Sequence, residues 1–190
     1  MDEETKKAVV ESLKKNRVLP RKHADFFNWY DKETKELAIC SELIHYLIKE
    51  CGESFNSIIL GSDPPDCIAI SEKQKVAIEI VELVDQSAIE KQIRSKHAYP
   101  CQEPWTSKRL TEHLNKLIQQ KDRPQEREYL KNLYPRYITL IHTDEPELMA
   151  SDFDRLYVKE TIQTTDLVNE VYLLFSYDPR IDGYPIRKLV

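Results

Sequence analysis

The 190-residue chain has little glycine and none of the short motifs that mark several large enzyme classes. It contains three glycines and no GxGxxG, P-loop or GxSxG motif. The sequence therefore gives no support for a dinucleotide-binding fold, a P-loop nucleotide hydrolase or a serine hydrolase. The five histidines form no HExxH or HxxxH pattern, which is the usual sequence mark of a zinc protease. The function must be sought in other residue types.

Paired cysteines and long apolar runs are also absent from the sequence. The four cysteines, Cys40, Cys51, Cys67 and Cys101, are widely spaced and form no CxxC pair. This pattern argues against a zinc site or a disulfide framework and favours reduced thiols. No run of 18 apolar residues occurs, and the polar, acidic beginning of the chain does not resemble a signal peptide. We therefore expect a cytoplasmic protein without a membrane partner.

Basic residues are concentrated in the middle of an otherwise acidic chain. The net charge is −5, but residues 91–136 contain 11 Lys or Arg against 5 Asp or Glu. Such an excess suits a phosphate-rich partner, although mixed charge on exposed helices is common. The aromatic residues among them, His97, Tyr99 and Trp105, are candidates for stacking on bases. The candidate nucleic-acid-binding residues are Lys91, Arg94, Lys96, Lys108 and Arg109.

The hydrophobic pattern predicts strands interrupted by helices. We expect strands over 57–60, 67–70, 75–81, 137–142 and 171–176, followed by a hairpin-like tail over 184–190. We expect helices over 3–15, 35–50 and 108–121, and a loop with a short helix over 146–156. This alternation predicts one α/β domain over 1–190, with a mixed sheet of about five strands and helices on both faces. Residues 1–32 would form a helix and connector within it.

Two carboxylates are predicted to face each other across the hairpin of strands 67–70 and 75–81. A four-residue turn, 71–74, pairs Ile70 with Lys75 and therefore brings Asp66 opposite Glu79. Opposed residues on one face have Cβ atoms roughly 4.5–5.5 Å apart, so the two charges repel unless a cation lies between them. A slip of one residue would separate the pair. The hairpin thus predicts a cation site if the register holds.

The apolar flanks of Glu79 favour a metal at this position. Residues 76–78 and 80–81 are apolar, which is typical of a strand buried on both faces. An ionised carboxylate in such a strand is costly unless it is paired or bound to a metal. Oxygen ligands of this kind suit Mg²⁺ or Mn²⁺. The alternative is that Glu79 lies on an exposed face or pairs with a lysine such as Lys75.

These residues resemble the PD-(D/E)XK nuclease superfamily. Pro65-Asp66 at the head of one strand and Glu79-Ile80-Val81 in the next match its two motif elements. The resemblance covers about Leu37 to His142. It implies a restriction-endonuclease-like fold in which Asp66 and Glu79 hold Mg²⁺ or Mn²⁺ and a bound water attacks a phosphodiester, in DNA rather than RNA. The motif lysine is missing, because Val81 stands in its place.

Two further residues fit the site that the resemblance implies. In the predicted helix 108–121, Lys121 lies about 20° from Leu110, in the centre of the apolar stripe, so its side chain either extends to water or enters a polar pocket. The motif lysine of the superfamily can come from an adjacent helix, so Lys121 is our candidate substitute. Glu42 lies about 60° from Ile39 at the edge of the stripe of the first sheet-covering helix. It is the candidate for the helix glutamate of that superfamily, or else a solvated flank residue.

The sequence leaves two other functional classes open. The valine in the lysine position favours a catalytically inactive nuclease fold that serves as a binding module. Alternatively, the chain is an acidic interaction or immunity-type protein in which Asp66 and Glu79 are surface charges. No feature of the sequence demands a homodimer.

Overall fold

The computed structural model describes residues 31–95, 104–123, 125–145, 147–158 and 161–190, with the side chains of 92–95 left out. The chain divides into two compact units. One comprises residues 25–83 and 105–190 and contains the whole sheet; the other comprises 1–24 and 84–104. The predicted helix over 3–15 and the connector up to residue 30 lie outside the described residues. The second unit contributes one described helix, α3 (Gln86–Ser95).

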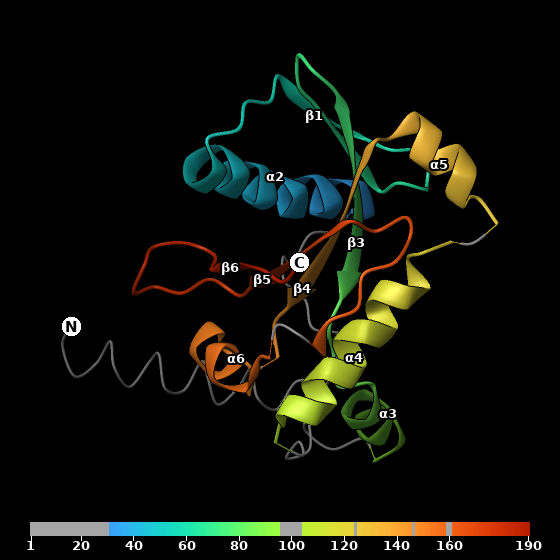
Figure 1. The fold of residues 1–190 in the computed structure, drawn as a ribbon. Helices are drawn as coiled ribbons and strands as arrows, with labels where there is room; N and C mark the ends of the chain where they lie inside the picture. The colour runs from blue at the N-terminus through green and yellow to red at the C-terminus, as the bar shows by residue number, and fades with distance from the viewer. Residues whose placement is uncertain (1–30, 96–103, 124, 146, 159–160) are drawn as a thin grey trace. The chain divides into compact units, whose positions relative to one another are not determined.

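The sheet-bearing unit has an α/β fold, as the sequence predicts (Figure 1). Its strands are β1 (Ser57–Leu60), β2 (Cys67–Ile70), β3 (Lys75–Glu82), β4 (Arg136–Thr143), β5 (Glu170–Phe175) and β6 (Ile186–Lys188). Its helices are α2 (Lys32–Cys51), α4 (Ser107–Gln120), α5 (Arg127–Leu133) and α6 (Ala150–Leu156). The sheet order is β1-β2-β3-β4-β5-β6. Strands β3, β4 and β5 are parallel, and the other neighbours are antiparallel.

The mixed sheet with flanking helices is therefore confirmed, with six strands in the described residues instead of about five. The extra strand is β6, which pairs with β5 over three residues within the predicted tail 184–190. No helix in the described part of the chain is long and apolar enough to cross a membrane.

The register of the β2–β3 hairpin is the one that the four-residue turn predicts. Ile70 pairs with Lys75 and Ile68 with Ala77. The Ser71 hydroxyl fixes the turn, because it accepts a hydrogen bond from the Gln74 N–H at 3.1 Å and donates one to the Gln74 carbonyl at 3.0 Å. This local closure sets which residues of the two strands are opposite each other.

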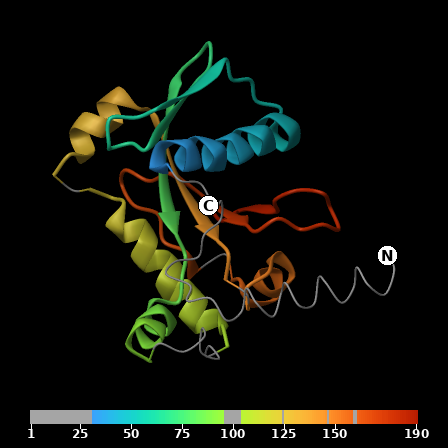
Figure 2. The same cartoon turned by 180° about the vertical axis from the view of Figure 1, so that it is seen from behind.

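Helices cover both faces of the sheet (Figures 1 and 2). The even-numbered residues of β3, such as Ile78, pack in one apolar cluster with α2. The odd-numbered Ala77 lies in the other cluster, with α4. The apolar residues of the two helices in these clusters are Ile39, Leu43 and Leu47 of α2 and Leu110, Leu114 and Ile118 of α4. Glu79 is odd-numbered, so it lies on the α4 face of the sheet.

Candidate active site

Asp66 is held at the head of β2 by a tight loop. The Gly61 N–H donates a hydrogen bond to the Asp66 carbonyl at 2.8 Å. Only glycine fits at position 61, because a Cβ there would lie 1.7 Å from the Pro65 carbonyl oxygen. The Asp66 carboxylate then reaches across to β3, where its Oδ2 accepts a hydrogen bond from the Ile80 N–H at 2.7 Å. The loop thus aims Asp66 at the strand that carries Glu79.

Glu79 is fully buried and makes three hydrogen bonds through its two carboxylate oxygens. Its Oε1 accepts from the Tyr137 hydroxyl at 2.9 Å and from Arg123 Nε at 3.2 Å. Its Oε2 accepts from Lys121 Nζ at 2.5 Å. Tyr137 reaches Glu79 because β4 runs parallel to β3 with Ala77 opposite Tyr137. The buried charge is therefore paired, as burial of a carboxylate requires.

Lys121 joins the two carboxylates. Its Nζ lies 2.5 Å from Glu79 and 3.7 Å from Asp66. Helix α4 ends at Gln120, and Lys121 is the residue that caps it. The side chain is 17% exposed, so it extends into the polar pocket and not to water. The structure therefore brings Asp66, Glu79 and Lys121 together, as the sequence predicts.

Arg123, like Tyr137, is a member of this cluster that the sequence did not reveal. The turn after α4 sends alternate side chains in opposite directions, and Arg123 has a positive φ of 43°. Lys121 and Arg123 reach Glu79, whereas the buried Asp122 between them pairs with Arg127 and accepts a hydrogen bond from the Leu167 N–H at 3.3 Å. Because Leu167 is distant in sequence, no local pattern identifies this turn.

The two carboxylates have opposite pKa shifts. Burial, together with the charge of Glu79, raises the pKa of Asp66 to about 6, although the Ile80 N–H and Lys121 act to lower it. Burial acts to raise the pKa of Glu79 as well, but Lys121, Tyr137 and Arg123 outweigh it and hold that pKa below its ordinary value. A carboxylate that titrates near neutral pH beside one that stays ionised is an arrangement typical of functional sites.

The donor set is compatible with a hard divalent cation. Within the described residues no three or more His, Cys, Asp or Glu side chains group in a way that could hold a metal ion. Mg²⁺, however, is commonly bound through one or two carboxylates, and water or phosphate fills its other positions. Asp66 and Glu79 supply two such carboxylates around one point, which the Lys121 ammonium occupies. The residues present therefore fit Mg²⁺ or Mn²⁺ only if Lys121 moves.

Glu42 does not join this site. It lines a hollow with Tyr46, Asp154 and Arg187, on the side of the sheet where β6 lies. The carboxylate of α2 whose charge acts on Asp66 is Glu36, which comes six residues earlier. The helical periodicity of the sequence predicts that Glu42 lies at the edge of the apolar stripe of α2. It does not determine which end of α2 lies near Asp66. The structure therefore places Glu42 away from the two carboxylates.

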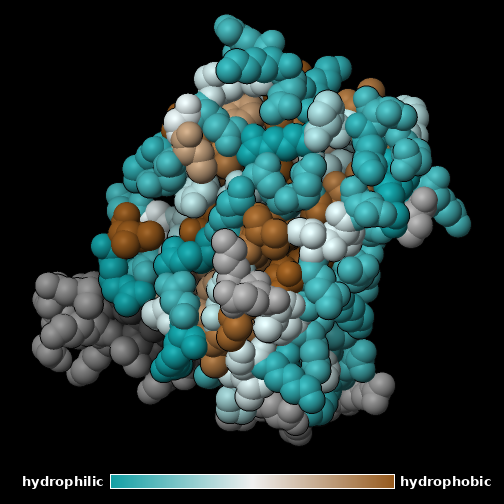
Figure 3. All heavy atoms as spheres, in the orientation of Figure 1, coloured by the Kyte–Doolittle hydropathy of each residue, from teal (hydrophilic) through white to brown (hydrophobic). Residues whose placement is uncertain are grey.

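The predicted nucleic-acid-binding residues do not gather around the carboxylates. Lys108 and Arg109 lie in the first turn of α4, roughly 18 Å from Lys121 at about 1.5 Å per residue. Lys91 is exposed on α3, in the other unit. The side chain of Arg94 and the whole of Lys96 lie outside the described residues. The hydrophilic surface over α4 and α5 is seen in Figure 3.

The three aromatic residues predicted to stack on bases give no stacking surface in the described residues. Trp105 is 5% exposed, and Arg109 lies over its ring at 4.5 Å. His97 and Tyr99 lie outside the described residues. Part of the basic excess is also neutralised by acids from elsewhere in the chain, since Arg127 pairs with Asp166 and Arg136 with Glu170. These pairs make the basic excess of the segment smaller in the folded chain than in the sequence.

Comparisons with family models, with curated proteins and with solved structures found no match to this chain. The functional argument therefore rests on the chemistry of the cluster formed by Asp66, Glu79, Lys121, Arg123 and Tyr137, which we name the Glu79 cluster.

Proposed function

We propose that the protein is a metal-dependent nuclease that hydrolyses phosphodiester bonds in DNA and uses Asp66 and Glu79 to bind Mg²⁺ or Mn²⁺. The observation that carries the proposal is the convergence of the two carboxylates on one cation, Lys121 Nζ, at 3.7 and 2.5 Å. A point that holds one positive charge between two buried carboxylates is electrostatically suited to a second kind of cation.

The bound ion would supply an activated water and would offset the charge that develops on the phosphate. The pKa of Asp66 is about 6 without a metal, and a bound divalent cation would lower it and hold the carboxylate in the ionised form that a ligand requires. Lys121 and Arg123 are the cations available for the phosphate oxygens once they leave the carboxylates. Tyr137 holds Glu79 in place through its hydroxyl.

The positions of three elements support the proposal. Pro65-Asp66 stands at the head of β2, Glu79 stands in the next strand, and α2 precedes the sheet. Val81 lies on the same face as Glu79 but packs against the apolar cluster of that face, where it takes no part in polar chemistry. Lys121 supplies the ammonium that the motif lacks, and this supports the assignment of the lysine role to it.

A catalytically inactive binding module is the second candidate, and one observation favours it. Both oxygens of Glu79 are already engaged, by Lys121 on one side and by Arg123 and Tyr137 on the other. A cluster neutralised by its own cations can hold the fold together without a metal. This candidate and the nuclease differ in whether a divalent ion and turnover accompany the cluster.

The test is cleavage of plasmid and single-stranded DNA in EDTA, Mg²⁺ or Mn²⁺. We expect cleavage only with a metal ion, and we expect Glu79→Gln and Lys121→Gln each to lower its rate on the order of 10²–10³-fold. Glu170→Gln is the matched control, because Glu170 is also held by an arginine, a lysine and a tyrosine. Loss of activity in Glu170→Gln as well would mean that folding, and not chemistry, is affected.

Metal binding without cleavage of DNA or RNA would replace the nuclease with the binding module. No metal binding together with no cleavage would favour the interaction protein, in which Asp66 and Glu79 only carry charge.

A further inference from the structure

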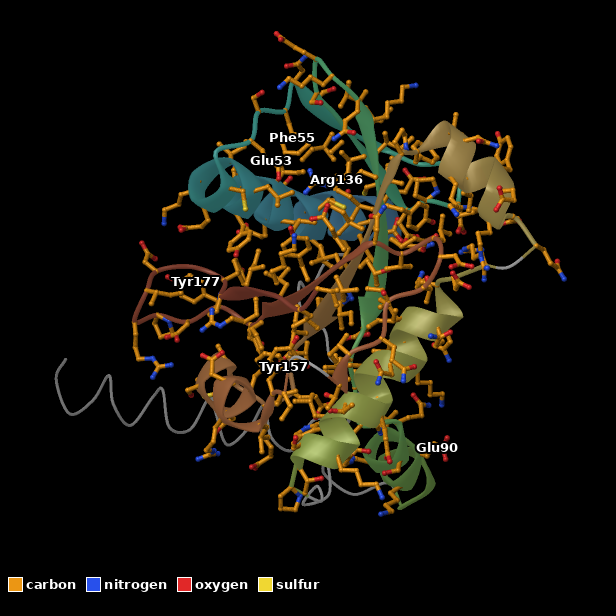
Figure 4. The ribbon with its side chains drawn as sticks, viewed as in Figure 1. Glu53, Phe55, Glu90, Arg136, Tyr157 and Tyr177 are labelled. Carbon is orange, nitrogen blue, oxygen red and sulfur yellow. The ribbon has the colours of Figure 1, made fainter. Side chains whose placement is uncertain are left out.

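Strand β6 forms the floor of a hollow of about 730 Å³. One wall comes from α2, through Glu42 and Tyr46, and the other from α6, through Ser151 and Asp154. Since α2 packs on one face of the sheet and α6 on the other, the free edge of β6 lies between two helices. We name this hollow the β6 trough. The hairpin loop that leads into β6 carries Tyr177 (Figure 4).

Among the described residues, the backbone of β6 pairs with another strand on one side only, with β5. Pro185 and Leu189 make hydrogen bonds to β5, at 2.9 Å to the Phe175 N–H and 2.8 Å to the Val171 carbonyl. Because backbone groups alternate along an antiparallel strand, those of Ile186 and Lys188 face away from β5. The Ile186 carbonyl confirms this direction, since it accepts a hydrogen bond from the side chain of Arg187, at 3.1 Å. The open groups face the trough.

The size of the β6 trough matches a short extended segment. Neighbouring strands are about 4.8 Å apart, layers are about 10 Å apart and each residue rises about 3.3 Å, so one residue of an added strand fills roughly 160 Å³. The hollow of about 730 Å³ therefore holds about 4 or 5 residues. Strand addition of this kind gains affinity from main-chain hydrogen bonds and specificity from side-chain pockets.

The charges of the β6 trough indicate what the segment carries. Four ion pairs within the chain neutralise most of its other charged groups: Arg187 with Asp154, Arg180 with Asp178, Lys49 with Glu50 and Lys188 with Glu170. Asp182, which also lines the trough, is exposed and accepts a hydrogen bond from the Tyr177 hydroxyl. Glu42 has no ion pair in the described part of the chain, and it is half-buried. A lysine or arginine side chain of the bound segment would supply the positive charge that pairs with the Glu42 carboxylate.

We propose that the β6 trough binds an extended peptide segment of a partner protein, which adds as a strand to β6 and places a Lys or Arg side chain on Glu42. A second copy of this chain is a poorer occupant, because pairing of β6 with itself would bring Arg187 and Lys188 of both copies together. In the free protein the Arg187 side chain donates a hydrogen bond to the Ile186 carbonyl at the edge of β6. A backbone N–H of the incoming peptide replaces the Arg187 side chain as the donor to this carbonyl. The proposal does not depend on the nuclease.

The test is selection of random heptapeptides displayed on phage against the immobilised full-length protein. Synthetic peptides of the enriched sequences are then measured by fluorescence anisotropy. We expect the enriched peptides to share a Lys or Arg, and Glu42→Gln to weaken their binding roughly tenfold or more. Lys188→Pro removes an outward N–H without touching the bonds to β5, so we expect it to abolish binding. Lys188→Ala, which keeps that N–H, is its matched control.

Three results would overturn the proposal. The first is the absence of enriched peptides, and the second is binding that Glu42→Gln and Lys188→Pro leave unchanged. The third is concentration-dependent dimerisation in sedimentation that Lys188→Pro abolishes, because this would assign the edge to a second copy. DNA cleavage by Glu42→Gln is measured in parallel. Unchanged cleavage together with weaker peptide binding shows that the peptide site and the proposed nuclease site are separate.

Discussion

Two buried ionic clusters in the sheet are built from the same residue types but differ in how their carboxylates are satisfied. In the Glu79 cluster, a strand carboxylate accepts from a tyrosine, a lysine and an arginine, and Asp66 lies beside it. In the second, which we name the Glu170 cluster, Glu170 accepts from Tyr172, Lys188 and Arg136, and Glu53 completes the group (Figure 4).

The second carboxylate of each cluster makes the difference. Glu53 binds Arg136 through both of its oxygens, at 2.5 and 3.0 Å. The pKa of Glu170 is held at about 2, because Arg136, Tyr172 and Lys188 outweigh its burial. Asp66, by contrast, has its lysine at 3.7 Å and a pKa raised to about 6 by burial. The Glu170 cluster is a satisfied structural link, and the Glu79 cluster retains an under-neutralised carboxylate, which is a mark of function.

Removal of the central arginine of the Glu170 cluster should have the largest effect on stability. Arg136→Met leaves Glu53 and Glu170 without their shared partner, and loss of one partner of a buried pair costs about 3–5 kcal/mol. We expect this decrease in the free energy of unfolding, measured by urea denaturation at pH 7. Arg155→Met is the control, because its pair with Asp152 is exposed and contributes less than about 1 kcal/mol. Equal effects in both variants would contradict the structural role.

Asp66 should make the free energy of unfolding fall as the pH rises, whereas an ordinary ion-paired carboxylate makes it rise. Its pKa is about 6 in the folded protein against 3.8 for the free group. Stability from Asp66 is therefore fully present below pH 3.8 and falls as the pH rises through 6, by up to about 3 kcal/mol. In EDTA, Asp66→Asn should remove this decrease and be more stable than the wild type at pH 8. Unfolding free energies from pH 4 to 8 measure it, and a less stable Asp66→Asn at pH 8 would refute it.

Glu170→Gln supplies the contrast in the same experiment. Because the pKa of Glu170 is lowered from 4.5 to about 2, its stabilisation is present above pH 4.5 and is lost as the pH falls through 2. The variant should therefore lose stability at pH 7, and its difference from the wild type should shrink in acid. The two substitutions together separate a structural carboxylate from one that is proposed to be functional.

Local rules in the sequence account for the pairing of Asp66 with Glu79 and for the position of Lys121. A four-residue turn sets the hairpin register, and helical phase places Lys121 on the buried side of α4. Arg123 and Tyr137 were missed because their positions depend on the turn after α4 and on the register between β3 and β4. Both arise from packing between segments distant in sequence, which no local pattern encodes.

The same limit explains the misplaced Glu42 and the overestimated basic surface. Helical phase identifies the buried side of α2, but the end of the helix that lies near Asp66 depends on the loop 52–56 and the meander that follows. The charge excess of residues 91–136 is real in sequence, yet Arg127 and Arg136 are neutralised by Asp166 and Glu170 from later segments. Charge counts predict a surface only where tertiary partners are absent.

The finest comparison is between Lys121 and the metal ion proposed to take its place. If the ammonium occupies the cation position, Lys121→Met should bind Mn²⁺ more tightly than the wild type, by about tenfold, because the carboxylates lose their internal competitor. The same variant should fail to cleave DNA, since it lacks the cation proposed to contact the phosphate. Isothermal titration with Mn²⁺ measures the affinity, and Lys116→Met, another lysine of α4 but exposed, is the control. Weaker binding by Lys121→Met would instead mean that the ammonium organises the carboxylates for the ion and does not exclude it.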